Sequence, residues 1–347
     1  MRVVDFRSDT VTHPTPEMRK AMFEAEVGDD GRGDDPTVNR LEAMAAERLG
    51  KEAAMFVASG TMGNLVPILT HAQRGDEIII GDKAHIFRSE SGGAAALGSI
   101  SYHTIPNDSR GMLDPDDIKN AIRSPSNVRH PRTALVAFEN TQNACGGAVL
   151  TPEDTEVIAD VANSHDLPLH IDGARIFNAA VSLETPVAEL VKRADSVTFC
   201  LSKGLSAPIG SVVSGSNEFI ERARVVRAMV GGGMRQVGVI AAAGIVALET
   251  MVDRLAEDHA NARKLALGLS NIPGISIDPD SLPTNLVFFD VTTGDPAGLA
   301  RRLDQRGIKG GTPVRRWRFV THYGITADDI DYALDVVEST FKEHATV

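Results

Sequence analysis

Two short apolar runs, each followed by a charged side chain, constrain the fold of this 347-residue chain more than any other feature. They span residues 169–171 and 197–201. Both are too short for helices and are flanked by breakers, so they are predicted to be buried strands of a parallel sheet. The first delivers Asp172 and the second delivers Lys203. Because ligands of open α/β sheets bind beyond the carboxyl ends of the strands, both side chains are expected to face one ligand.

A lysine and an aspartate placed in this way meet the needs of pyridoxal 5'-phosphate. A lysine amine holds that cofactor as a Schiff base, and an aspartate keeps its ring nitrogen protonated so that the ring accepts electrons. The alternative is a surface ion pair between Asp172 and Lys203, which would contribute roughly 0–1 kcal/mol. Lys203 lies directly after an apolar strand and before a turn containing Gly204, Pro208 and Gly210. Few solvated lysines have that setting, so we favour the cofactor.

Length and charge restrict the class of protein. A chain of 347 residues exceeds the size at which one core stops growing, which predicts a large and a smaller domain. The net charge of −12 argues against nucleic acid and against an anionic membrane as partners. No signal peptide or membrane-spanning run is evident. Two cysteines, Cys145 and Cys200, fit a reducing cytoplasm, and no metal is expected from Cys/His spacing or from the acidic loop 28–36.

The order of predicted elements indicates an α/β fold. Strands and helices alternate as far as about residue 215, which is typical of a doubly wound sheet. We expect a large cofactor-binding domain at 13–250 and a small α+β domain at 251–347, with 1–12 near the active site. Further strands are predicted at 53–57, 77–81, 99–105, 134–138, 285–291 and 316–320, and helices at 16–26, 36–50, 152–164, 217–229, 236–252, 256–270, 296–306 and 326–342.

Candidate ligand-binding residues also follow other strands. Gly60 and Thr61 lie at a strand-to-helix turn, where backbone N–H groups and a hydroxyl suit a phosphate, although small residues at such turns are common for steric reasons. His85 and Glu90 follow the strand at 77–81. A single histidine is more often structural, but at a strand's carboxyl end an imidazole suits a planar cofactor or acid–base chemistry.

Arg318 is a candidate for carboxylate binding. It alternates with Trp317 and Phe319 on the strand at 316–320, so its side chain is expected on the opposite face. The simple interpretation is an exposed charge on an edge strand. The functional one is a guanidinium that forms two hydrogen bonds with a substrate carboxylate.

Seven motifs together resemble the low-specificity L-threonine aldolases. The resemblance is collinear from residue 7 to the last helix, and the SKG and HIDGAR motifs together are its most specific part. It implies a fold type I pyridoxal phosphate enzyme of the aspartate aminotransferase architecture, an amino acid substrate, and a homodimer or homotetramer with shared active sites. The motifs are RSDTVT (7–12), DDPTVNRLE (34–42), FVASGTMGNL (56–65), HIDGARIFNAA (170–180), FCLSKGLSAPIGS (199–211), GGGMRQ (231–236) and FVTH (319–322).

The resemblance implies which residues bind the cofactor. Lys203 would carry it, Asp172 would pair with the ring nitrogen, and Arg175 would contact the side of the phenolic oxygen. His85 would stack on the ring. The phosphate would be held by Gly60 and Thr61, with help from Arg235 of a neighbouring subunit.

Substrate contacts are implied in the same way, with two departures from the family pattern. Ser8 and Arg318 would bind the substrate carboxylate, and Glu90 would take part in proton transfer. Gln142 stands where the family has a histidine that touches the substrate hydroxyl, and an amide cannot take a proton at neutral pH. Arg32 replaces a tyrosine, and we expect it to pair with Asp30 or Asp34 rather than with a second substrate carboxylate.

The predicted activity is the cleavage of L-threonine or L-allo-threonine-like amino acids to glycine and an aldehyde. With Gln142 in place of histidine, the base would be His85, Glu90 or an ordered water. The alternative on this scaffold is an amino acid racemase, in which Lys203 moves the α-proton, or an aldolase of different selectivity. A transaminase and a non-catalytic cofactor-binding protein are less favoured.

Overall fold

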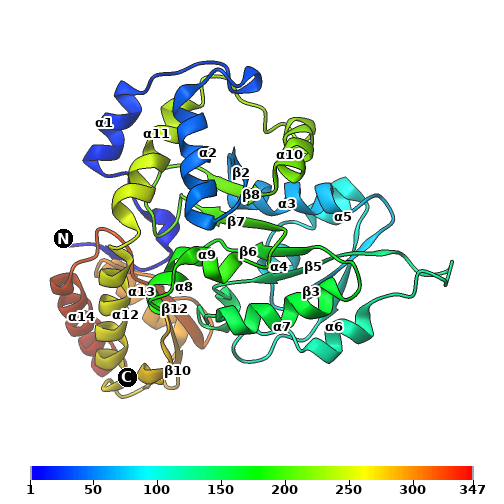
Figure 1. Ribbon diagram of the computed structural model, residues 1–347. Coiled ribbons are helices and arrows are strands. Elements are labelled where there is room, and N and C mark those ends of the chain that lie inside the picture. The colour runs from blue at the N-terminus through cyan, green and yellow to red at the C-terminus, as the bar shows by residue number, and fades with distance from the viewer. Residues whose placement is uncertain (1, 346–347) are drawn as a thin grey trace.

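A seven-stranded sheet forms the centre of the computed structural model, which describes residues 2–345 (Figure 1). The strand order is β2-β8-β7-β6-β5-β3-β4. β8 runs antiparallel to the other six strands of this sheet, which confirms the predicted, mainly parallel α/β architecture. The strands are β2 (Ala53–Val57), β3 (Glu77–Gly81), β4 (Ser101–Ile105), β5 (Thr133–Glu139), β6 (Leu169–Asp172), β7 (Ser196–Cys200) and β8 (Ser211–Gly215).

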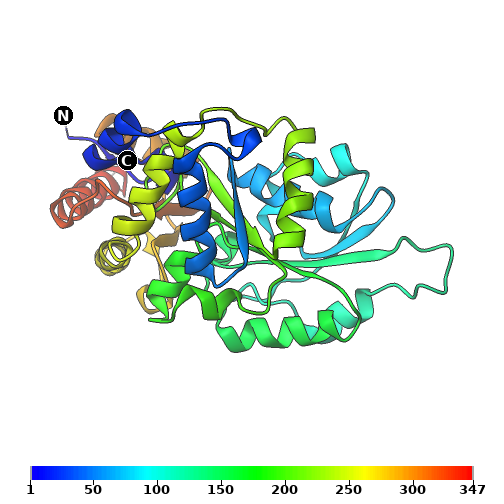
Figure 2. The same ribbon diagram turned by 45° about the horizontal axis from the view of Figure 1, so that its top comes forward.

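Helices cover both faces of this sheet (Figure 2). On β3, Ile79 contributes to the core on one face, while Ile78 and Ile80 contribute to the core on the other. Strands covered on both faces are apolar throughout, which is why the sequence shows runs rather than alternation. The first face carries α2 (Pro36–Leu49), α6 (Pro115–Ala121), α7 (Pro152–Asn163), α8 (Ile176–Ser182), α9 (Val187–Val191) and α11 (Gly238–Val246), and the second carries α3 (Gly60–His71), α5 (Gly93–Gly98) and α10 (Asn217–Met229).

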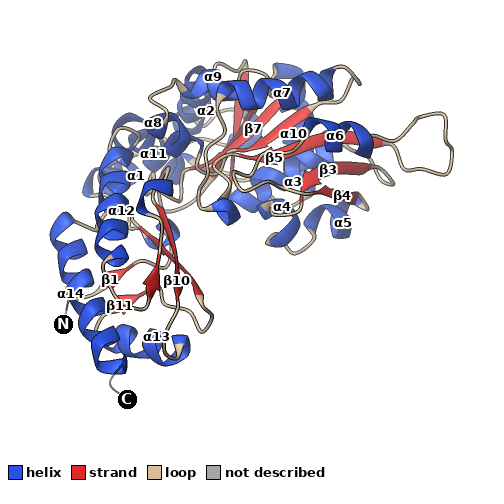
Figure 3. Cartoon of the chain, turned by 90° about the horizontal axis from the view of Figure 1, so that it is seen from below, coloured by secondary structure: helices blue, strands red, loops and turns tan. Residues whose placement is uncertain are grey.

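The C-terminal part has its own sheet and core (Figure 3). Phe289, Trp317 and Phe319 are buried there in mutual ring contacts. This separate core agrees with the predicted small domain, whose boundary at residue 251 stays a prediction. The elements are β9 (Ile275–Ser276), β10 (Leu286–Val291) and β12 (Arg316–Val320), covered by α12 (Leu255–Ser270), α13 (Pro296–Gln305) and α14 (Ala327–Ala345).

The N-terminal segment connects this small core to the sheet domain. β1 (Val4–Asp5) pairs in parallel with β11 (Ile308–Lys309), and Phe6 stacks on Phe319. The chain then crosses to α1 (Pro16–Glu24), which packs against α11. Residues 7–12 therefore pass between the two cores.

A local sequence signal accounts for the start of α2. Asp35 caps α2 and Pro36 takes the first helical position, as predicted. The helix predicted at 236–252 is instead α11 followed by a π-helical segment, Ala247–Met251. Across residues 2–345, no helix combines the length and the hydropathy needed to cross a membrane.

Candidate active site

Asp172 is a buried carboxylate at the end of β6. Its Oδ2 accepts a hydrogen bond from Asn64 Nδ2 at 2.9 Å, and its Oδ1 accepts one from the Ala174 N–H at 3.1 Å. Within residues 2–345, no lysine, arginine or histidine forms an ion pair with it. A buried carboxylate without a cation is costly, so a cationic group of a ligand fits beside Asp172.

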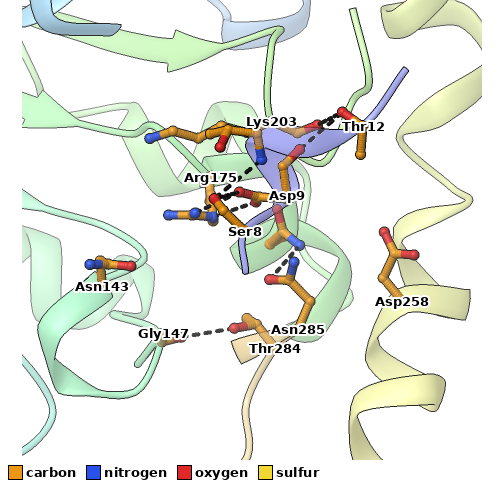
Figure 4. A network of polar contacts seen from close by, with 12 residues as sticks. Ser8, Asp9, Thr12, Asn143, Gly147, Arg175, Lys203, Asp258, Thr284 and Asn285 are labelled. Carbon is orange, nitrogen blue, oxygen red and sulfur yellow. Dashed lines mark hydrogen bonds and ion pairs between the residues drawn. The ribbon is translucent and has the colours of Figure 1, made fainter. Parts of the chain in front are cut away.

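Lys203 lies beyond the end of β7, the strand that pairs with β6. Its carbonyl oxygen accepts a hydrogen bond from Thr12 Oγ1 at 3.4 Å (Figure 4). It also accepts one from the Ser206 N–H at 2.9 Å, and the two contacts fix the loop. The ammonium itself has no hydrogen bond or ion pair in the described chain. The charge of Asp172 raises the pKa of His85 and the charge of Lys203 lowers it, so both groups lie within electrostatic range of one imidazole.

His85 and Glu90 form a hydrogen-bonded pair in this site. His85 begins α4 (His85–Arg88), and its Nδ1 lies 2.9 Å from Glu90 Oε1. This hydrogen bond raises the pKa of His85 against the opposing effect of burial, and burial raises the pKa of Glu90. Asn64 Nδ2 donates to Glu90 as well as to Asp172, so one amide connects the pair to that carboxylate.

The same three side chains have a spacing that a metal ion would tolerate. Ligand atoms of His85, Glu90 and Asp172 all lie within 4.8 Å of one another. A metal ion there would compete with a pyridine nitrogen for Asp172. The expectation that no metal is used stays a prediction.

The start of α3 offers a phosphate site. Ser59 caps this helix by accepting a hydrogen bond from the Met62 N–H. Among the described residues, the N–H groups of Gly60 and Thr61 have no acceptor. Free N–H groups at the positive end of a helix suit a phosphate. Arg235, predicted to assist from a neighbouring subunit, is exposed in its own chain and lies 3.4 Å from Asp29.

Arg175 is held by a buried carboxylate (Figure 4). Its Nε and Nη2 donate to Asp9 at 2.6 and 2.7 Å. Burial alone would raise the pKa of Asp9, but Arg175, together with Lys203, lowers it to about 2. In the part of the chain that the structure describes, only Nη1 of Arg175 is left without a partner, so the predicted contact with the cofactor would use that nitrogen. Ser8 caps the turn at Asp9–Val11 by accepting from the Thr10 N–H.

Arg318 has no carboxylate partner within the described residues. It is half-buried on β12 and faces away from the buried Trp317 and Phe319, as predicted. Its Nη1 donates to Asn143 Oδ1 at 3.0 Å and its Nη2 to the Arg7 carbonyl oxygen at 3.2 Å. Burial, followed by the charge of Arg175, lowers the pKa of Arg318. A guanidinium held by neutral oxygens beside a second guanidinium suits an incoming carboxylate.

Gln142 and Arg32 make contacts within loops rather than facing the proposed ligand site. Gln142 is fully buried, with Nε2 donating to the Lys83 carbonyl at 2.9 Å and Oε1 accepting from the Cys145 N–H at 2.9 Å. The geometry therefore shows Gln142 as a loop-capping residue, and a substrate contact stays a prediction without geometric support. Arg32 is largely exposed and lies 3.9 Å from Asp29, so it pairs inside the acidic loop but not with the predicted Asp30 or Asp34; Asp30 pairs with Arg227 instead.

Sequence reasoning missed two residues of the site, Glu139 and Asn64. Glu139 is buried at the end of β5, and the sheet register places it beside Asp172. Burial, followed by the charge of Asp172, raises the pKa of Glu139 to about 7. The strand-end rule that identified Asp172 would have found Glu139 had the predicted strand been one residue longer. Asn64 lies within a helix and carries no comparable signal.

The unpaired groups match the charged groups of one cofactor. Asp172 suits a protonated pyridine nitrogen, the Lys203 amine suits Schiff-base formation, and the start of α3 suits a phosphate. With the mainly parallel sheet, this donor set defines a pyridoxal phosphate-dependent enzyme of fold type I.

Within that class, the chain belongs to the beta-eliminating lyase family, whose model matches residues 5–292. It is 47% identical to low-specificity L-threonine aldolase 1 of Arabidopsis thaliana, covering 96% of this chain and 95% of that protein. It is 43% identical to the low specificity L-threonine aldolase of Escherichia coli strain K12, covering 94% and 96%. A solved structure of Leishmania major threonine aldolase has the same fold, with a TM-score of 0.84 at 20% identity over 97% of this chain and 99% of that one.

Proposed function

We propose that this chain cleaves L-threonine-like β-hydroxy-α-amino acids to glycine and an aldehyde. The observation that carries the proposal is a set of three charged groups, Asp172, Lys203 and Arg318, that have no oppositely charged partner among residues 2–345. The high identity to relatives named low-specificity L-threonine aldolases supports the reaction type. When bound, pyridoxal phosphate supplies the electron sink that accepts the bonding pair of the broken Cα–Cβ bond.

The residues of this chain position the substrate. Arg318, with Ser8, would hold the substrate carboxylate, while Lys203 and Asp172 would hold the cofactor. With the carboxylate and the cofactor both held, the substrate's Cα–Cβ bond has a fixed orientation. Such orientation contributes ~7–11 kcal/mol to barrier reduction in favourable cases, so loss of Arg318 should lower kcat as well as substrate affinity.

His85 is the side chain best placed to accept the β-hydroxyl proton. Its Nδ1 faces Glu90, and its Nε2 has no hydrogen bond within the described chain. If Nδ1 carries the proton of the neutral ring, Nε2 is the free acceptor. Glu90 would then stabilise the imidazolium that forms.

Replacement of the proposed cofactor lysine tests this function. Lys203→Ala should abolish the visible absorbance band of the lysine-bound cofactor together with cleavage of threonine, because no other amine replaces it. The assay would use L-threonine, L-allo-threonine and phenylserine, with glycine and aldehyde measured as products. An unchanged spectrum would refute the assignment of Lys203.

The same assay separates the alternatives. Interconversion of alanine enantiomers without aldehyde release would identify a racemase, and accumulation of the pyridoxamine form of the cofactor would identify a transaminase. Binding without any turnover would identify a cofactor-binding protein. Each outcome replaces the aldolase proposal.

We also propose that the protein is a cytoplasmic homodimer or homotetramer with domains at 13–250 and 251–347. Two free cysteines and the absence of a disulfide among residues 2–345 agree with a reducing compartment. Phe23 on α1 and Met229 on α10 are 91% and 74% exposed, and a contact with another subunit would remove them from water. Size-exclusion chromatography with light scattering would measure the assembly.

A further inference from the structure

Glu139 occupies the centre of a hydrogen-bond network at the carboxyl edge of the sheet. Its side chain is buried, with an overall exposure of 5%. Oε2 accepts from the His85 N–H at 2.8 Å, and Oε1 accepts from the Asn143 N–H at 2.9 Å. One carboxylate therefore fixes the main chain of two loops that are far apart in the sequence.

Each of these two loops carries a proposed functional contact. His85 is the start of α4, and its ring faces Glu90. Asn143 Oδ1 accepts the hydrogen bond from Arg318 Nη1 at 3.0 Å. Glu139 thus connects the histidine to the guanidinium through two main-chain hydrogen bonds and one side-chain hydrogen bond.

We propose that Glu139 is a positioning residue that sets the distance between His85 and Arg318. The proposal rests on the proposed function, because it assigns Arg318 to the substrate carboxylate and His85 to the cofactor and β-hydroxyl side. Glu139 acts through the main chain and touches neither ligand.

A carboxylate is suited to this position because both of its oxygens accept hydrogen bonds. The amide of a glutamine would turn an NH₂ group toward one of the two main-chain N–H groups. That N–H would lose its acceptor in a buried site, and the loop carrying it would shift. Gln142 Nε2 adds a third, longer contact of 3.4 Å to Oε2. Burial and the charge of Asp172 raise the pKa of Glu139, whereas the hydrogen bonds from the Asn143 and His85 N–H groups lower it, so these two contacts favour the ionised carboxylate.

The test compares Glu139→Gln and Glu139→Asp with a control, Glu77→Gln. Glu77 is another buried glutamate of the same sheet, at the start of β3, where it pairs with Arg123. The holoenzymes would be compared by thermal unfolding, by the visible cofactor band, by the dissociation constant of glycine read from that band, and by KM and kcat for threonine.

We expect Glu139→Gln to keep the cofactor band but to weaken glycine binding by about 10- to 100-fold, the loss of one hydrogen bond to a charged group. KM for threonine should rise with it and kcat should fall. Glu139→Asp should restore part of the glycine affinity and of the threonine kinetics, and Glu77→Gln should change neither the glycine affinity nor the kinetics. Glycine affinity equal to wild type in Glu139→Gln, or an equal loss in Glu77→Gln, would overturn the proposal.

A double-mutant cycle separates positioning from general destabilisation. If Glu139 acts through Arg318, Glu139→Gln should have little further effect on glycine affinity in an Arg318→Lys background. Full additivity would contradict the proposal. Should Glu139→Gln fail to fold, Asn143→Ala, which removes only the acceptor of Arg318, should give the same loss of glycine affinity, and wild-type affinity there would equally overturn it. Glycine binding does not require cleavage, so failure of the aldolase assignment would appear separately, as absence of aldehyde from the wild-type protein.

Discussion

Three cationic side chains, Arg175, Lys203 and Arg318, lie around one buried carboxylate, Asp9. Asp9 pairs directly with Arg175, and its charge also acts on Arg318 and Lys203. Asp9 neutralises Arg175, whereas Arg318 has only neutral oxygen partners among residues 2–345. The guanidinium of Arg318 therefore suits an anionic group of the ligand.

Asp9→Asn should destabilise the fold in a pH-dependent way. At pH 7 the variant leaves Arg175 buried without its partner, which costs about 3–5 kcal/mol of unfolding free energy. The pKa of Asp9 is lowered from 3.8 to about 2, so its stabilisation is present above pH 4 and is lost as the pH falls through the folded pKa. The difference from wild type should therefore shrink by about 2 kcal/mol between pH 4 and pH 2.

Urea unfolding at pH 7, 5, 4, 3 and 2 would measure this difference. Asp34→Asn, on the exposed acidic loop, is the matched control and should behave as wild type. A difference between wild type and Asp9→Asn that stays constant from pH 7 to pH 3 would contradict the linkage.

The sequence was sufficient to find residues that a strand presents directly. Asp172 and Lys203 follow apolar runs, and the end of a strand can be predicted from the hydrophobic pattern alone. Glu139 and Asn64 were missed because their importance depends on neighbours in space: β5 must lie beside β6, and α3 must cross the same edge. Gln142 illustrates a different limit: its substrate contact was inferred from the family pattern and stays a prediction, whereas its buried capping role could be seen only in the structure.

At the scale of elements, α3 packs unusually close to β7. Gly63 makes this possible, because a Cβ at that position would lie 2.5 Å from Thr198 Cγ2. Thr198 is buried, and its hydroxyl donates to the Gly63 carbonyl. The close contact brings the start of α3 to the carboxyl edge of the sheet, where the proposed phosphate site lies.

Gly63→Ala should push α3 away from β7. Overpacking of this kind costs about 1–3 kcal/mol, and the displaced helix start should also bind the cofactor more weakly. Gly93→Ala is the matched control, since its Cβ would meet only Leu65 Cδ1 at an ordinary 3.6 Å and it also lies in a helix. Chemical denaturation and cofactor titration would measure both effects, and equal behaviour of the two variants would show that α3 tolerates the displacement.

Elements with a long apolar or periodic signal were predictable, and short ones without it were not. β3 and β5 consist entirely of buried residues and were recognised as strands. β8 was missed. Its five residues follow Gly210 and contain two serines, so the sequence pattern does not distinguish them from the preceding loop. Its antiparallel direction arises because it returns directly after β7 without a crossover helix.

At the scale of the whole molecule, the active site draws on both cores and on the N-terminal segment between them. Arg318 comes from the small sheet, Lys203 and Asp172 from the large one, and Asp9 from the segment that crosses between them. Arg235 is the exception. Its 74% exposed side chain contacts Asp29 on the acidic loop and lies on a surface that a second subunit could cover.

Subunit mixing tests whether Arg235 completes the site of a neighbouring subunit. Lys203→Ala removes the cofactor lysine, and Arg235→Ala would weaken phosphate binding in the partner's site. In a heterodimer of the two variants, one site has neither residue, while the other has its own Lys203 and receives Arg235 from its partner. Because one of two sites is intact, purified heterodimers should show about half of the wild-type activity at limiting cofactor, well above either homodimer.

If Arg235 instead serves its own subunit, each site of the heterodimer lacks one residue, and activity should stay at the level of the Arg235→Ala homodimer or below. The heterodimer would be purified over two columns from differently tagged subunits and assayed at several cofactor concentrations. If its advantage over the Arg235→Ala homodimer disappears at saturating cofactor, the effect of Arg235 lies in cofactor binding.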